Sequence, residues 1–283
     1  MSKFFPLLFI LLWSSAFITT LPIVQNSDPF SALAFRFFLV AICFFIYSVY
    51  QNVKIIVNPK NLFNSLSTGI LFHGFYLGGV FYSIFIGFPT SLTALIVTMQ
   101  PILTNLVAGY FLKEKVSFNQ WLGVFLGFTG AVMVLGFDIG SSLPIEGVVA
   151  SVIALIAITT STIWQKRISN NIPLSVNNMY QAMGAVLFHL IIVIFIFKEP
   201  FLKINKQFLL AMSHQVFLVS LGAFSILMYL IKKNSASKTV SLFFLIPVVT
   251  ALMAWMFLGE VLMKIDILGF IIASVGVFLS TKK

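Results

Sequence analysis

The stretch Pro101-Ile-Leu-Thr104-Asn-Leu-Val-Ala108-Gly-Tyr-Phe111-Leu-Lys-Glu114 recurs further along the chain as Pro247-Val-Val-Thr250-Ala-Leu-Met-Ala254-Trp-Met-Phe257-Leu-Gly-Glu260. Each copy is followed by two glycines, Gly123 and Gly130 after the first, Gly269 and Gly276 after the second. The register shift is 146 throughout, and 10 of the 35 residues from position 101 to 135 are identical without a gap. The chain therefore consists of two copies of one unit, which we place at residues 1–137 and 144–283.

The composition indicates that both copies of the unit lie in a lipid bilayer. Hydrophobic residues make up 60% of the chain and charged residues only 8%, whereas roughly a quarter of the residues in a soluble domain are charged. Apolar runs long enough to cross a hydrocarbon core of about 30 Å recur along the sequence, and alternating strand patterns are absent. The fold class is therefore all-α. The ten predicted spans are Phe4–Val24, Phe30–Tyr50, Leu66–Phe88, Leu92–Leu112, Trp121–Phe137, Val148–Trp164, Val176–Phe197, Phe208–Ile231, Val240–Leu258 and Ile265–Leu279.

The number of spans fixes how the halves are oriented. Because each half has five spans, an odd number, the second half enters the membrane in the opposite direction, which gives the inverted repeat of many secondary transporters. With a cytoplasmic N-terminus, 12 basic residues lie in inner segments and 4 in outer loops, as the positive-inside rule requires. The net charge of +10 reflects this topology and gives no support to nucleic-acid binding. We predict a bacterial cytoplasmic membrane protein with both termini in the cytoplasm.

Ionisable side chains inside the spans are the first candidates for function. Arg36 is the only formally charged side chain well inside a span, where a charge costs roughly 2.5–3.5 kcal/mol on insertion scales. It either snorkels to the headgroups or pairs with carbonyls, or it binds an anionic substrate group or takes part in gating. His73, with Tyr76 nearby, indicates a surface that faces a cavity. His73 and His189 are predicted as the only mid-span groups that titrate near neutral pH, with structural hydrogen bonds as the alternative role.

The repeated prolines indicate a second set of candidates. Pro101 and Pro247 each remove a helical hydrogen bond and bend their helices, and such breaks often expose carbonyls to a cavity in membrane proteins. Gln100 and Thr104, beside the first proline, either contact substrate or hydrogen-bond a neighbouring helix. Trp13, Ser14 and Trp164 are further candidates for the wall of the same cavity.

Groups for catalysis or metal binding are missing. All seven carboxylates lie at or near span ends, one cysteine and three histidines do not form a ligand cluster, and no Ser/His motif is present. We therefore predict no enzymatic activity, no metal and no cofactor. Glu114 and Glu260 are assigned a structural role at the start of the helix that follows each of them, and Gly123 and Gly269 are assigned to helix packing.

Several of these residues together resemble the EamA family of the drug/metabolite transporter superfamily. Trp13-Ser14-Ser15-Ala16-Phe17 is similar to the family's first-span signature, with Ser14 in place of the usual glycine. The segment from Pro29 to Arg36 is similar to the second-span pattern. Both Pro-to-Glu stretches resemble the segment that ends in Phe-Leu-Gly-Glu, except that Lys113 replaces the glycine in the first copy.

The resemblance implies ten helices around a central cavity lined mainly by spans one, three, four, six, eight and nine. It also implies export of amino acids or related metabolites, so we expect a secondary active transporter that works by alternating access on a small, partly aromatic or apolar metabolite. Proton coupling, and a monomer or homodimer, are compatible with this expectation. The alternatives are an uptake carrier for a nucleotide-like or cofactor metabolite, which would place Arg36 in the cavity, and a passive facilitator.

Overall fold

The computed structural model describes residues 4–88, 90–113, 115–135, 144–168, 172–197, 200–258 and 263–281. Within these ranges the chain is helical, and the only β-structure is an isolated bridge between Ser27 and Leu202. Eight helical segments of the described chain are long and apolar enough to cross a membrane. With the segment α5–α6 and helix α7 added to these eight, the helical segments correspond one to one with the ten predicted spans.

The first half contains five such segments. They are α1 (Phe5–Val24), α2 (Pro29–Tyr50), the continuous α3 (Pro59–Gly69), η2 (Ile70–Tyr76) and α4 (Leu77–Phe85), the broken pair α5 (Thr90–Thr98) and α6 (Gln100–Leu112), and α7 (Phe118–Leu135). The second half follows the same order. Its segments are α8 (Ile145–Ile168), α9 (Leu174–Phe195), the continuous α10 (Lys206–His214), η3 (Gln215–Ala223) and α11 (Phe224–Lys233), then α12 (Ala236–Val240), η4 (Ser241–Phe244) and α13 (Leu245–Leu258), and α14 (Lys264–Thr281).

The register shift of 146 that relates the two sequences also relates the two structures. Adding 146 to the bounds of α7, 118 and 135, gives 264 and 281, the bounds of α14. The π-helical segment η2 at residues 70–76 maps to 216–222, which lies inside the π-helical segment η3. The two halves thus share the regular helices and also a rare irregularity at one position.

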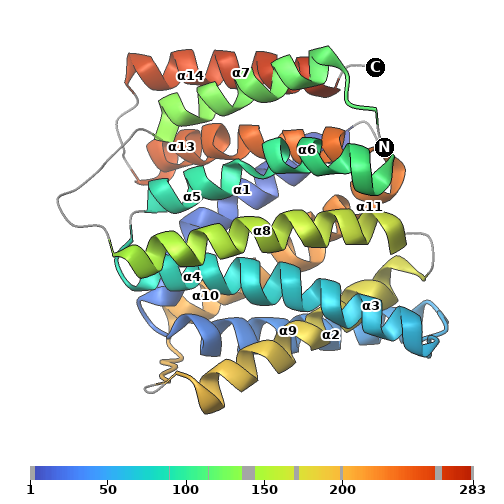
Figure 1. Cartoon of the computed structure of the whole chain (residues 1–283). Helices are drawn as coiled ribbons and strands as arrows, with labels where there is room; N and C mark the ends of the chain where they lie inside the picture. The colour runs from blue at the N-terminus through green and yellow to red at the C-terminus, as the bar shows by residue number, and fades with distance from the viewer. Residues whose placement is uncertain are drawn as a thin grey trace.

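The repeated segments run in opposite directions. Figure 1 shows α5–α6 running toward the side of the bundle where α1 begins and α14 ends, whereas α13 runs away from that side. The proline-bearing helices therefore traverse the bundle antiparallel to each other, and the two ends of the described chain lie on one side. This confirms the inverted arrangement predicted from the odd number of spans.

Helices α7 and α14 cross through the repeated glycines. A Cβ atom added to Gly123 would lie 2.5 Å from the carbonyl oxygen of Gly276, and one added to Gly130 would lie 2.5 Å from the carbonyl oxygen of Gly269. Each glycine thus meets the counterpart of the other glycine, as a two-fold relation between the halves requires. Only residues without a side chain allow the backbones to approach this closely.

Local signals in the sequence explain where several helices begin. Asp28 caps α2 by accepting hydrogen bonds from the backbone N–H groups of Phe30 and Ser31, at 3.0 and 2.8 Å, with Pro29 at the first helical position. At α7 the backbone N–H of Ser117 donates to Gln120 Oε1, and the N–H of Gln120 donates to Ser117 Oγ. This reciprocal pair is a capping box, formed by Ser117 and Gln120 at the start of α7.

The outer surface of the bundle is apolar. Large hydrophobic side chains on several helices are more than half exposed, among them Ile46, Phe125 and Phe278 at 60%, 66% and 62%. Exposed apolar area on this scale is the expected exterior of a protein surrounded by lipid. The interior accordingly contains the polar side chains, among them Arg36, which is only 4% exposed.

Candidate functional site

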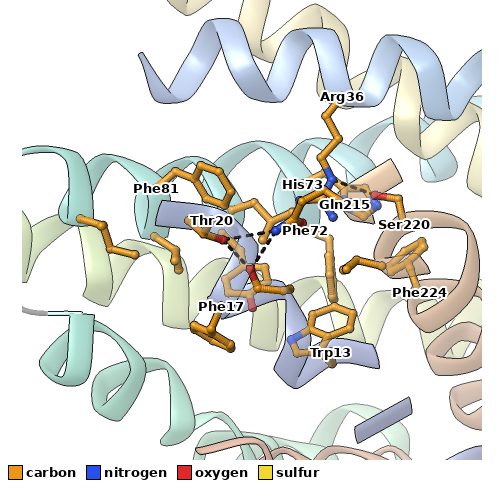
Figure 2. Close-up of a pocket in the computed structure, with 16 residues that line it drawn as sticks. Trp13, Phe17, Thr20, Arg36, Phe72, His73, Phe81, Gln215, Ser220 and Phe224 are labelled. Atoms are coloured by element: carbon orange, nitrogen blue, oxygen red, sulfur yellow. Dashed lines mark hydrogen bonds between the residues drawn. The ribbon is translucent and has the colours of Figure 1, made fainter. Parts of the chain in front are cut away.

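A cavity lies between the two halves, and the empty space in it and at its open mouth together amounts to about 550 Å³. Its walls come from α1, from η2 with α4, and from η3 with the first residue of α11, and Arg36 of α2 reaches into it (Figure 2). The residues from α4 extend to Ile84, next to the turn that ends this segment, so the cavity lies toward the side opposite the chain ends. It is lined by Trp13, Ala16, Phe17, Thr20, Arg36, Phe72, His73, Tyr76, Leu77, Val80, Phe81, Ile84, Gln215, Val219, Ser220 and Phe224.

Both π-helical segments contribute residues to the wall of this cavity. A π-helix bonds residue i to residue i+5, so side chains five apart lie closer to one face than they do in an α-helix. Gln215 and Ser220 in η3 are five residues apart, and both line the cavity. Phe72 of η2 and Leu77 just after it have the same spacing and also line the cavity. The irregular helix therefore brings the members of each pair closer to one face.

Among the described residues that line the cavity, Arg36 is the only arginine or lysine. Its Nε donates a hydrogen bond to Ser220 Oγ at 2.9 Å, and its guanidinium carbon lies 5.3 Å from the centre of the Phe37 ring. Among the described residues no carboxylate pairs with it, and its two Nη nitrogens have no protein acceptor but are not sealed off from the cavity. The Arg36 side chain thus points inward to Ser220, away from the headgroups. Its two Nη nitrogens can donate hydrogen bonds to a ligand in the cavity.

The His189 side chain lies against the backbone of His73. His189 Nε2 donates to the carbonyl oxygen of His73 at 3.0 Å, because a carbonyl can only accept. The His73 ring packs between Phe37 and Phe224, each with a centroid distance of 4.4 Å. His73 lines the cavity and His189 does not. The contact of His189 with the π-helical backbone indicates a structural role for this residue.

Replacing His189 by leucine should destabilise the fold, because the buried His73 carbonyl would lose its donor. A typical buried hydrogen bond contributes about 0.5–1.5 kcal/mol, so the melting temperature in detergent should fall by a few degrees. His189→Gln retains an N–H donor of similar reach and should recover most of the loss. A leucine variant as stable as the wild type would show that the hydrogen bond contributes nothing.

The remaining predicted site residues lie outside the cavity wall. Ser14 Oγ donates to the carbonyl oxygen of Ile246 at 3.2 Å, next to Pro247, and so joins α1 to α13. Gln100 Nε2 donates to Thr162 Oγ1 at 3.0 Å, which joins α6 to α8. Pro101 and Thr104 are buried on the same helix as Gln100, and Trp164 packs near Phe63 with a centroid distance of 6.4 Å. The structure therefore brings together four of the predicted residues: Trp13, Arg36, His73 and Tyr76.

Glu114 and Glu260 lie outside the described residues, so their predicted structural role remains a prediction. Gly123 and Gly269 both lie at the crossing of α7 with α14.

Sequence reasoning missed the polar face of η3 and one histidine. Gln215 and Ser220 are polar residues inside the eighth predicted span, and this signal could have identified them. His214 lies in the same membrane-spanning segment, Lys206–Lys233, and was not among the predicted site residues. Its Nε2 lies 3.0 Å from Ser15 Oγ and its Nδ1 3.1 Å from Thr19 Oγ1. The cavity-lining phenylalanines gave no signal, because the chain has 33 phenylalanines.

Comparison with known proteins identifies the family. The model of the EamA-like transporter family matches residues 3–136 and again residues 145–282. The chain belongs to the EamA-like transporter family. It is therefore a multi-pass membrane transporter, and the family resemblance seen in the sequence is confirmed.

Relatives of this EamA-like transporter span nearly its whole length. The "Uncharacterized transporter YyaM" of Bacillus subtilis (strain 168) is 27% identical over 264 residues, which cover 88% of this chain and 83% of the relative. The "Uncharacterized transporter YoaV" of the same organism is 21% identical over 277 residues, covering 96% and 93%. A solved structure described as "Crystal structure of protein" superposes with a TM-score of 0.83 at 18% identity over 99% of this chain and 96% of that one, and shows the same fold.

At the opposite end of the EamA-like transporter, side chains of α8 hydrogen-bond the ends of two other helices. A smaller cavity of about 290 Å³ lies there among α8, α9 and α11. Above it, Lys166 Nζ donates to the carbonyl oxygens of Ile231 and Asn234 at 2.9 and 2.6 Å, at the end of α11. Arg167 Nε donates to the carbonyl oxygen of Phe111 at 3.1 Å, at the end of α6. Cations at helix C-termini are stabilising, so this pair fastens the end of α8 to the ends of two other helices.

Proposed function

We propose that this transporter is a secondary active carrier that moves a small metabolite with an anionic group and an apolar or aromatic body, most simply an amino acid or a related compound, across a bacterial cytoplasmic membrane. The observation that carries the proposal is the Arg36 guanidinium, which is unpaired with any described carboxylate and lies in a cavity walled by aromatic side chains. A buried cation without a counter-ion is costly in a membrane protein and is a functional candidate by default. A substrate carboxylate would supply the missing charge and accept the free Nη donors.

Alternating access is supported by the distribution of space along the bundle. The larger cavity lies toward the side opposite the chain ends, and the side that carries them is fastened by Lys166 and Arg167. Two inverted halves supply two related arrangements of such a bundle, each open to one side. With both termini in the cytoplasm, the cavity lies on the outer half, and efflux is the direction that the family resemblance implies.

Weakening the fastened end should shift the carrier toward the arrangement open on that side. Lys166→Met removes the bonds to the end of α11 but keeps the length and apolar stem of the side chain. In a Cys43→Ser background, a cysteine placed at Asn177, in the wall of the smaller cavity, should react with a soluble maleimide about tenfold faster, the rate expected for a shift of roughly 1.4 kcal/mol. Lys203→Met, at the other side, is the control. Unchanged labelling of the Lys166→Met variant would contradict this role.

The proposed function is tested by flux through proteoliposomes. Purified protein is reconstituted, and uptake and release of radiolabelled amino acids are followed with and without a pH gradient. Saturable flux that exceeds the flux of empty liposomes is expected, and acceleration by the gradient would establish proton coupling. Absence of flux for every amino acid and related carboxylate would refute the proposal. Rates far above about 10³ per second without saturation would instead identify a passive facilitator.

A second candidate is uptake of a nucleotide-like or cofactor metabolite. The position of Arg36 in the cavity favours it, because this residue can bind a phosphate as well as a carboxylate, and the rings of Trp13, Phe72 and Phe224 offer surfaces on which a base could stack. Competition of nucleotides with labelled amino acid in the same liposomes distinguishes the two candidates. Displacement by nucleotides at lower concentration than by any amino acid would favour the second.

A further inference from the structure

The amide of Gln215 has its donor side fully engaged and its acceptor side empty. Nε2 lies 2.9 Å from the carbonyl oxygen of Ala16, 3.0 Å from Thr19 Oγ1 and 3.3 Å from Thr20 Oγ1, all on α1. The Ala16 carbonyl can only accept, so the atom facing it must be the nitrogen, and the orientation of the amide is fixed. Oε1 is buried and has no hydrogen-bond partner.

Gln215 Oε1 lacks a hydrogen-bond donor. Buried side-chain acceptors in folded proteins almost always have a partner, and an unsatisfied one is a candidate for a functional role. Gln215 is 1% exposed and belongs to the wall of the large cavity. Among the described residues no donor of the protein satisfies Oε1, and the atom itself is closed off in this arrangement. Because Gln215 belongs to the cavity wall, the cavity is the side from which a donor would reach it when the wall moves.

Gln215 lies on the same face as the residue that holds Arg36. Ser220, five residues further along η3, accepts the hydrogen bond from Arg36 Nε, and Figure 2 shows Gln215, Ser220 and the Arg36 guanidinium in one region of the cavity. The site therefore combines unused donors on Arg36 with one unused acceptor on Gln215. A ligand that matches both carries an anionic group and, on the same end of the molecule, an N–H donor.

We propose that Gln215 is a specificity-determining residue, whose Oε1 accepts a hydrogen bond from an amino group of the substrate while Arg36 binds its anionic group. The inference rests on the proposed function and narrows it, because it requires the amino group and not only the anion. No described carboxylate lines the cavity, so the amino group would be held by this neutral oxygen and by the faces of the surrounding rings, which attract cations.

A series of three ligands tests the inference on the wild-type protein. L-Phenylalanine has the carboxylate, the ring and the amino group, 3-phenylpropionate lacks the amino group, and phenylalanine betaine keeps a positive nitrogen but has no N–H. Binding is measured by calorimetry in nanodiscs. If Gln215 accepts from the amino group, phenylalanine should bind at least about tenfold more tightly than the other two, the expected loss for a hydrogen bond to a charged group. Equal affinities for all three would overturn the inference and leave the proposed function intact.

Variants then assign the preference to Gln215. Gln215→Met keeps the approximate size of the side chain and removes the acceptor, so the ratio of the phenylalanine affinity to the 3-phenylpropionate affinity should fall from about tenfold to about one. Thr19→Val is the matched control, because it removes a partner of Nε2 and leaves Oε1 in place, so the preference should persist. A preference retained in Gln215→Met would overturn the inference. If the wild type binds neither phenylalanine nor 3-phenylpropionate, the proposed substrate class itself fails, and the inference fails with it.

Discussion

Replacing Arg36 by methionine should reduce transport of anionic substrates by at least about 100-fold, while the protein remains as stable as the wild type or becomes more stable. The loss is expected because no other arginine or lysine is found among the described residues of the cavity wall, and a bidentate contact with a carboxylate is among the strongest that a side chain makes. The gain in stability is expected because the variant no longer buries a charge, which costs roughly 2.5–3.5 kcal/mol on insertion scales.

The prediction is specific because transport should fall while stability stays the same or rises. A residue that only held the fold together would lose activity and stability at once. Kinetics in proteoliposomes and melting temperature in detergent are measured on the same preparations. Arg36→Lys retains a charge but lacks the planar group that contacts Ser220 and a substrate carboxylate together, so it should transport at an intermediate rate. Full transport by Arg36→Met would exclude Arg36 from the substrate site.

Replacing Gly123 or Gly130 by leucine should prevent the protein from folding. The atoms that a side chain at Gly123 would meet are the carbonyl oxygen of Gly276 and the backbone nitrogen of Ser280, both at 2.5 Å from the position of its Cβ. Overpacking costs about 1–3 kcal/mol where neighbouring side chains can move, and here the neighbours are backbone atoms that move only if α7 and α14 separate. Membrane yield and size-exclusion profiles in detergent measure the outcome.

A matched glycine provides the control for this experiment. At Gly222 the nearest atom is the end of the flexible Leu12 side chain, 3.3 Å from an added Cβ, so Gly222→Ala should give a profile like that of the wild type. A monodisperse Gly123→Leu protein at wild-type yield would show that the close crossing is not required.

Most features of the fold that could be predicted followed from the sequence repeat. Once Pro101 and Pro247 were placed in register, the paired spans, their opposite directions and the packing role of Gly123 followed from odd span number and from residue size. The start of the third segment was predicted too late, at Leu66, because Pro59 and the Asn58 cap begin a helix whose first turns are polar. Hydropathy detects the apolar part of a helix and not its full length.

The site was predictable only where a polar residue stood out from an apolar background. Arg36 and His73 were found because a charge or an imidazole inside a span demands an explanation. Phe72 and Phe224 could not be found, since nothing separates a cavity-lining phenylalanine from a lipid-facing one in sequence. The π-helical segments also gave no signal, although η3 contributes Gln215 and Ser220 to the cavity wall.

The glycine crossing also has a consequence for how the chain acquires its direction in the membrane. Because Gly123 meets Gly276 and Gly130 meets Gly269, each helix is self-complementary: it carries both contacts needed to pair with an upside-down copy of itself. This contact surface is the same for either orientation of the two halves in the membrane. The lysines outside the bilayer, and not the packing of α7 on α14, must then determine the orientation in the membrane. Moving these lysines to the opposite loops should therefore invert the topology of the protein without weakening the contact between α7 and α14.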